Sequence, residues 1–196
     1  MKEIEAPESI YLLLPRFVTE EDNDYAAGKY LPAVIRDFEW ENLSFRFVIS
    51  PARVRDESGE DRHYYPGRQE RVVETALRQL AVEDNANFRS EESTLDFTQS
   101  QLMNEIYSLS RDSDSRLKRD DVDLSIRILA DVKYELISND YEGSELYFRP
   151  IERLVVREIN GEVYYRSQLS ELFFRQTEQF DFCFPGKNAV IEDSSE

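Results

Sequence analysis

The chain has 196 residues, of which 41 are Asp or Glu and 24 are Lys or Arg, so its formal net charge is −17. Such a charge repels DNA, RNA and anionic membranes at long range, and a nucleic-acid site therefore requires a locally basic surface. Hydrophobic residues make up 40% of the chain and aromatic residues 12%, which argues against a wholly disordered acidic protein.

The sequence also predicts where the protein works. It has no apolar stretch of the roughly 18 residues that a membrane helix needs, so we expect no membrane partner. The apolar run near the N-terminus is too short for a signal peptide and follows acidic residues. The single cysteine, Cys183, cannot form an internal disulfide. These features favour a cytoplasmic protein.

The length allows one domain, or one domain with a small appendage. Residues 1–30 are polar and acidic in part, and we predict an irregular acidic arm there. We expect the folded domain over residues 31–184 and a loose acidic tail over residues 185–196.

The first predicted elements are strands. Alternation followed by an apolar run predicts a strand over residues 43–49. Residues 57–61 read as a turn, with Arg53–Arg55 leading into it and His63–Tyr65 leaving it.

Three helices are predicted next. Residues 66–84 place apolar side chains along one stripe at helical spacing. A second helix begins near Thr98, which forms a capping box with Gln101. After a polar loop, a third helix runs from Lys118 to Lys133. The stripes of the three helices are Val72, Val73, Ala76, Leu77 and Leu80; Leu102, Ile106 and Leu109; and Val122, Ile126 and Leu129.

Strand patterns return in the last third of the chain. Residues 133–138 and 144–149 predict two strands joined by a turn. Residues 153–159 and 162–166 flank Asn160-Gly161, and Asn-Gly between such runs is the strongest short signal for a hairpin. A short amphipathic helix should follow over 167–176, and then a last strand or apolar anchor at 180–184.

Three helices followed by a β-hairpin is the element order of a winged helix, in which the third helix enters the major groove and the hairpin wing touches the DNA backbone. We therefore predict an α+β fold: a winged helix of three helices plus a β-hairpin wing, with an added N-terminal strand or arm.

Several segments resemble the first winged-helix domain of plasmid replication initiators. The run YYPGRQERVVETALRQLA at 64–81 is similar to that family's tyrosine–proline–glycine start and its helix with a glutamate–valine–alanine–leucine pattern. Segments similar to neighbouring elements of the family follow the same order: 48–61, 95–109, 118–136 and 162–182. The resemblance spans about residues 31–184. It implies a module that binds double-stranded origin-type DNA, dimerises, or does both.

The winged-helix order places several basic residues on the expected DNA face. They are Arg116, Lys118, Arg119 and Arg127 around the third helix, and Arg153 and Arg157 on the hairpin. The functional interpretation is phosphate contact. The structural interpretation, to which we give more weight, is ion pairing with the nearby acidic residues.

The acid excess supports an alternative function. Family members usually have basic DNA-binding surfaces and continue into a second winged helix, whereas this chain stops shortly after Phe184. The alternative is an acidic protein-binding module, or a DNA-mimic inhibitor from a mobile element, that docks on a basic nucleic-acid-handling partner. Its candidate acidic face comprises Asp112, Asp114, Asp120, Asp121 and Asp123.

No motif in the sequence predicts catalysis. His63 is the one histidine, and a zinc site needs several Cys or His ligands. The aspartates of residues 112–120 lack the glycine and final glutamate of a calcium loop. The chain has neither a Walker loop nor a GxGxxG motif. We expect no enzymatic activity, no cofactor and no metal.

Overall fold

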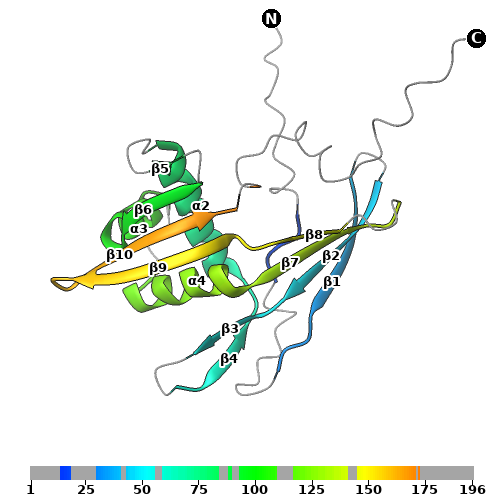
Figure 1. Ribbon diagram of the computed structural model, residues 1–196, viewed down its shortest axis with the longest axis horizontal. Coiled ribbons are helices and arrows are strands. Elements are labelled where there is room, and N and C mark those ends of the chain that lie inside the picture. The colour runs from blue at the N-terminus through cyan, green and yellow to red at the C-terminus, as the bar shows by residue number, and fades with distance from the viewer. Residues whose placement is uncertain are drawn as a thin grey trace, which may run out of the picture.

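The computed structural model describes residues 14–18, 30–40, 43–55, 59–83, 88–89, 93–109, 117–140, 145–170 and 172. Within these residues the chain forms ten strands and three helices, and the strands lie in three antiparallel sheets (Figure 1).

The first sheet brings together distant parts of the sequence. It contains β1 (Val34–Trp40), β2 (Leu43–Ser50), β7 (Lys133–Ser138) and β8 (Glu145–Phe148) in that spatial order. Every neighbouring pair of strands is antiparallel. Alternate side chains of β2 and β7 point into the core, where they are fully or nearly fully buried. These are Phe45, Phe47, Ile49, Tyr134 and Leu136.

The second sheet contains β5 (Phe88–Arg89), β6 (Thr94–Thr98), β10 (Glu162–Leu169) and β9 (Ile151–Ile159), again in spatial order. Strands β9 and β10 form the hairpin predicted around Asn160-Gly161, and both turn residues have positive φ, 54° and 78°. Two positive φ angles are required by a type I′ turn, which explains the Asn-Gly pair. The hairpin reaches out beyond the helices at the left of Figure 1.

The helices α2 (Arg68–Glu83), α3 (Gln99–Leu109) and α4 (Arg119–Asp131) pack against one another, and α3 and α4 also pack against the inner face of this sheet. Their predicted stripes supply much of the core, with Leu77, Leu102 and Ile126 completely buried. The capping box at the start of α3 is confirmed. Thr98 N–H donates to Gln101 at 2.8 Å, and Gln101 N–H donates to the Thr98 hydroxyl at 3.1 Å.

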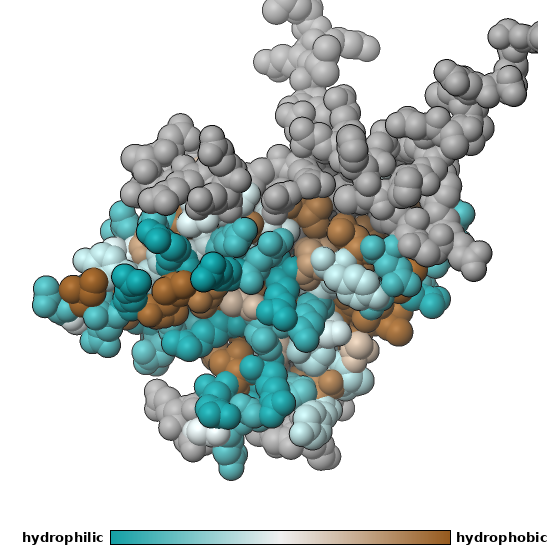
Figure 2. All heavy atoms as spheres, in the orientation of Figure 1, coloured by the Kyte–Doolittle hydropathy of each residue, from teal (hydrophilic) through white to brown (hydrophobic). Residues whose placement is uncertain are grey.

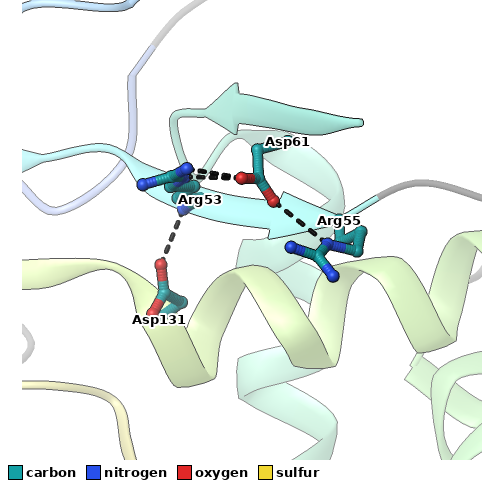
Figure 3. Close-up of polar contacts among 4 residues, drawn as sticks. All are labelled: Arg53, Arg55, Asp61 and Asp131. Carbon is teal, nitrogen blue, oxygen red and sulfur yellow. Dashed lines mark hydrogen bonds and ion pairs between the residues drawn. The ribbon is translucent and has the colours of Figure 1, made fainter. Parts of the chain in front are cut away.

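The third sheet is the two-stranded hairpin of β3 (Ala52–Arg55) and β4 (Asp61–Tyr64), which projects from the body (Figure 1). Asp61 forms ion pairs with Arg53 and Arg55 (Figure 3). The hydrogen bond from Arg53 is the main reason that the pKa of the Asp61 carboxyl is lowered. The backbone N–H of Arg53 donates to Asp131 at 2.6 Å, which holds the hairpin against the last residue of α4.

Residues 14–18 pack into the core although they form no helix or strand. Val18 N–H donates to the Pro66 carbonyl at 2.8 Å. Arg16 is 5% exposed and forms an ion pair with Glu74 of α2. The neighbouring Glu70 accepts hydrogen bonds from Gly67 N–H at 2.7 Å and from the Ser125 hydroxyl of α4 at 2.8 Å. Burial of these acids is tolerated because each has a partner.

The predicted architecture, a winged helix of three helices with a hairpin wing and an added N-terminal strand or arm, is wrong. A winged helix of that kind has one small sheet, whereas this chain builds three antiparallel sheets and has more residues in strands than in helices. Strand β7 pairs with β2, for example Ser138 with Phe45, and not with the wing hairpin. Alternation marks a strand but does not identify its partner, and this long-range pairing creates the four-stranded first sheet.

Individual elements agree better with the sequence. The strand at 43–49, the three helices, the strands at 133–138 and 144–149, and the hairpin are confirmed. The helix predicted over 167–176 is wrong at its start, because β10 continues through Leu169. The predictions for residues 180–184 and for the tail at 185–196 lie outside the described residues, as does most of the predicted arm. No described helix is long and apolar enough to cross a membrane.

Candidate nucleic-acid interface

The outer face of the second sheet, on the side away from the helices, is concave. It lines an open cavity with a volume of about 920 Å³. Three arginines line it, and we call this surface the arginine face. It comprises Thr94, Asp96 and Thr98 of β6, Gln101 of α3, Arg153, Val155, Arg157 and Ile159 of β9, and Tyr164, Arg166 and Gln168 of β10, and the buried Phe97 and Tyr165 also border it.

Strand register brings the three arginines together. Alternate residues of a strand point to the same face, and directly opposite residues on neighbouring strands share that face. Tyr164 is opposite Arg157, and Gln168 is opposite Arg153. Arg166 is opposite Val155, which lies midway between Arg153 and Arg157 in β9. The four-residue step along β9 separates the Cα atoms of its two arginines by about 13 Å.

The arginine face is locally basic. Arg166 forms a bidentate ion pair with Asp96, with Nε–Oδ1 and Nη2–Oδ2 distances of 2.6 and 2.9 Å. Asp96 is the one acidic residue among the described residues that line the surface. Arg153 and Arg157 are exposed and have no ion pair within the described part of the chain. Two positive charges without an ion pair among the described residues therefore lie on one face of a protein whose net charge is −17.

Apolar and aromatic groups accompany these charges. Tyr164 is 42% exposed and Ile159 is 51% exposed. Figure 2 shows hydrophobic residues along the hairpin end of the sheet, at the left of the view, with hydrophilic residues on either side. Exposed aromatic rings beside cations are suited to contacts with nucleic-acid bases and backbone.

The far end of the hairpin is fixed to α3. Glu162 accepts hydrogen bonds from both the backbone N–H and the hydroxyl of Ser100, each at 3.0 Å. The backbone N–H of Ser100 is the main cause of a lowered pKa of the Glu162 carboxyl, because it stabilises the charged form. The carboxylate thus attaches the hairpin to the N-terminal turn of α3, where the helix dipole favours a negative charge.

The inner side of the hairpin is fixed to α4. Tyr165 stacks on Phe97 with ring centroids 5.1 Å apart, and its hydroxyl donates to Asp123 at 2.9 Å. Asp123 also pairs with Arg127 at 2.6 Å, one helical turn further along. Burial, with the nearby Asp123 charge as a second cause, raises the pKa of the Tyr165 hydroxyl, so the tyrosine is the proton donor.

The remaining predicted site residues that the structure describes lie on or beside α4. Lys118 and Arg119 are exposed at the start of the helix, and Asp120 is exposed beside them. Asp121 caps this end by accepting a hydrogen bond from Lys118 N–H at 3.0 Å. The predicted sites Arg116, Asp112 and Asp114 lie outside the described residues. The structure therefore places the described basic candidates in three positions: Lys118 and Arg119 at the start of α4, Arg127 further along that helix, and Arg153 and Arg157 on the arginine face.

Sequence reasoning missed Arg166 and Asp96. Alternation within β10 was sufficient to place Arg166 on the same face as Tyr164. Its pairing with Asp96 required knowing that β6 is the other neighbour of β10, and the two residues are 70 positions apart.

No protein-family model and no curated protein matches this sequence. Two solved structures have a similar fold. The selenomethionine derivative of domains 2 and 3 of RctB aligns with a TM-score of 0.53 and 12% identity, covering 78% of this chain. A second structure of RctB domains 2-3 aligns with a TM-score of 0.50 and 12% identity, covering 76% of this chain. This chain spans 57% and 56% of those two chains. At such identity the likeness concerns the fold alone.

Proposed function

We propose that this chain is a DNA-binding module similar to those of replication initiators, and that the arginine face contacts the phosphate backbone of double-stranded, origin-type DNA. The observation that carries the proposal is the clustering of Arg153, Arg157 and Arg166 on one concave surface of an otherwise acidic protein. Phosphate contacts by arginine supply affinity for DNA without regard to sequence.

The fold comparison agrees with this proposal at a coarse level. RctB is a replication initiator, and the chain shares its domain fold over most of its own length. Replication initiators of the plasmid type are also the family that the sequence resembles. Lys118 and Arg119, at the exposed start of α4, are the second group of candidate contacts. Dimerisation is a further expectation from the resemblance, and light scattering of the purified protein tests it.

The proposal is tested by fluorescence anisotropy with a labelled duplex over a series of salt concentrations. We expect binding that weakens steeply with salt, and that the double variant Arg153→Gln/Arg157→Gln lowers the slope of log K against log salt by roughly 2, at about 0.9 per phosphate contact. The matched control is Arg68→Gln/Lys133→Gln, which removes the same charge from exposed sites elsewhere. Equal effects of the two double variants, or no binding at low salt, would contradict the proposal.

A protein-binding module remains the second candidate, because the first sheet carries the opposite charge on its outer face. Four carboxylates and two basic side chains share that face by strand register. They are Asp37, Glu39, Glu135 and Glu145, with Arg46 and Lys133. A pull-down that recovers a basic protein, together with no DNA binding at low salt, would favour this function.

A further inference from the structure

The Asp96–Arg166 ion pair occupies the middle of the arginine face. Arg166 lies on the central strand β10, opposite Asp96 on β6 and opposite Val155 on β9. Because Arg153 and Arg157 are two residues before and after Val155, Arg166 faces the midpoint between them. The side chain of Arg166 is 56% exposed and that of Asp96 is 35% exposed, so a bound polyanion can reach both.

The ion pair reduces the attraction of the arginine face for an anion. The carboxylate of Asp96 neutralises the guanidinium of Arg166 and holds it in a fixed plane through two hydrogen bonds. It also repels any phosphate that approaches the centre of the face. Exposed ion pairs contribute little to stability, however, so a strong competitor can break this one.

We propose that Asp96 is a specificity-determining residue that gates the arginine face: it withholds Arg166 from isolated anions and yields it to a polyanion whose phosphates are already bound by Arg153 and Arg157. This inference rests on the proposed function. A nucleic-acid strand held at two flanking arginines presents further phosphates to Arg166 at high effective concentration, whereas a single phosphate ion gains nothing from the flanking sites. The gate thus favours a phosphate chain over free phosphate.

The first sheet supplies a control for this test. Asp37 and Arg46 form a similar cross-strand pair on the outer face of the other sheet, with an Nε–Oδ1 distance of 3.1 Å. Both pairs join directly opposite residues on neighbouring strands and both are solvent-exposed. Asp96→Asn and Asp37→Asn therefore make the same change in net charge, and each breaks one exposed cross-strand ion pair, at different surfaces.

Anisotropy titrations of labelled duplex DNA with the two variants test the gate, with circular dichroism to check that each is folded. We expect Asp96→Asn to tighten duplex binding about fivefold at low salt, which is the effect in water of one guanidinium charge, that of the released Arg166, about 4 Å from a phosphate. We also expect it to steepen the log–log salt slope by about 0.9, because Arg166 is then released from Asp96 and can contact a phosphate. Asp37→Asn should change neither quantity. Equal behaviour of the two variants, or weaker binding by Asp96→Asn, would overturn the gate.

Two further variants, Arg166→Gln and Arg166→Gln/Asp96→Asn, show whether Asp96 acts through Arg166. In the Arg166→Gln background, the additional Asp96→Asn change should give much less than the fivefold gain. A gain of the same size in both backgrounds would mean that Asp96 merely repels anions, and would also overturn the proposal.

Failure of the gate can be separated from failure of the proposed function. If the wild-type protein does not bind duplex DNA, titration with inorganic polyphosphate and with inorganic phosphate still compares Asp96→Asn with Asp37→Asn. Tighter polyphosphate binding by Asp96→Asn alone would keep the gate and reassign its ligand. Equal binding by both variants would reject the gate as well.

Discussion

Tyr165 on β10 donates a 2.9 Å hydrogen bond to Asp123 on α4, and so joins the β9–β10 hairpin to the helix whose start carries the candidate DNA contacts Lys118 and Arg119. Asp123 had been a candidate for an acidic partner-binding face. The structure shows that it also holds Arg127, so one carboxylate links a strand and a helix and neutralises an arginine. The position of the hairpin relative to α4 therefore depends on the Tyr165–Asp123 hydrogen bond, and none of the three arginines of the arginine face takes part in it.

Loss of the Tyr165 hydroxyl should destabilise the protein. Tyr165→Phe removes a donor to a charged acceptor, and we expect a decrease in the free energy of unfolding of about 1 to 2 kcal/mol. Urea denaturation followed by circular dichroism measures it. Tyr164→Phe is the matched control, because the ring of Tyr164 is exposed on the other face of the same strand. This substitution should change the free energy of unfolding by less than about 0.5 kcal/mol. Equal effects would contradict the role given to the Tyr165–Asp123 bond.

The Glu162–Ser100 contact should make stability depend on pH. Folding lowers the pKa of Glu162 below its ordinary value of 4.5, so the unfolded chain binds the proton more readily than the folded chain does. The contribution of Glu162 is therefore fully present above pH 4.5 and is lost as the pH falls through the lower pKa of the folded state. Melting temperatures measured from neutral to acidic pH should show the Glu162→Gln variant losing less stability than the wild type in this window. Glu158→Gln, on the exposed part of β9, should follow the wild type; a Glu162→Gln curve parallel to the wild type at all pH values would refute the assignment.

The buried ion pair between Arg16 and Glu74 should be sensitive to removal of one partner. Both side chains are about 5% exposed or less, and Glu74→Gln removes the negative charge that pairs with the buried guanidinium. We expect a loss of about 3 to 5 kcal/mol in the free energy of unfolding. The exposed Asp37–Arg46 pair offers a comparison, since Asp37→Asn should lower the free energy of unfolding by no more than about 1 kcal/mol. A small effect of Glu74→Gln would show that residues 14–18 contribute little to the core.

The hairpin turn should require glycine at position 161. Its φ is +78°, and a Cβ there would meet no atom within 4 Å, so the cost of Gly161→Ala comes from the backbone alone. We expect a loss of about 1 to 2 kcal/mol in thermal or urea unfolding. Gly67→Ala is the control, because Gly67 has no positive φ and its Cβ would make ordinary contacts. If the two variants were equally stable, the turn conformation would not be the one described.

The sequence was informative wherever the structure is local. Helical periodicity identified α2, α3 and α4, Thr98 and Gln101 identified a cap, and Asn160-Gly161 identified the hairpin, since each signal lies within a few residues. Sheet organisation was not accessible in this way. Pairing of β2 with β7 joins residues more than eighty positions apart, and period-two alternation is the same whichever strand lies alongside.

In the candidate site, too, the residues whose placement depends on local structure were predicted, and those that depend on long-range strand pairing were not. Arg153 and Arg157 were identified because the hairpin is local and places both on one face. Arg166 and Asp96 were missed because their pairing depends on β6 lying beside β10, which follows only from the folded sheet. The net charge of the whole chain did not predict the charge of this local surface. An acidic protein can carry a basic face whose residues are close in space and dispersed in sequence.

The central claim is that DNA binds to the arginine face, and amide chemical-shift mapping by NMR during titration with duplex DNA tests it most directly. We predict that the amides of Arg153, Arg157 and Arg166 shift at low salt and return as salt is added, while those of β1 and β8 on the first sheet do not move. Shifts confined to the first sheet, or none at low salt, would contradict the account.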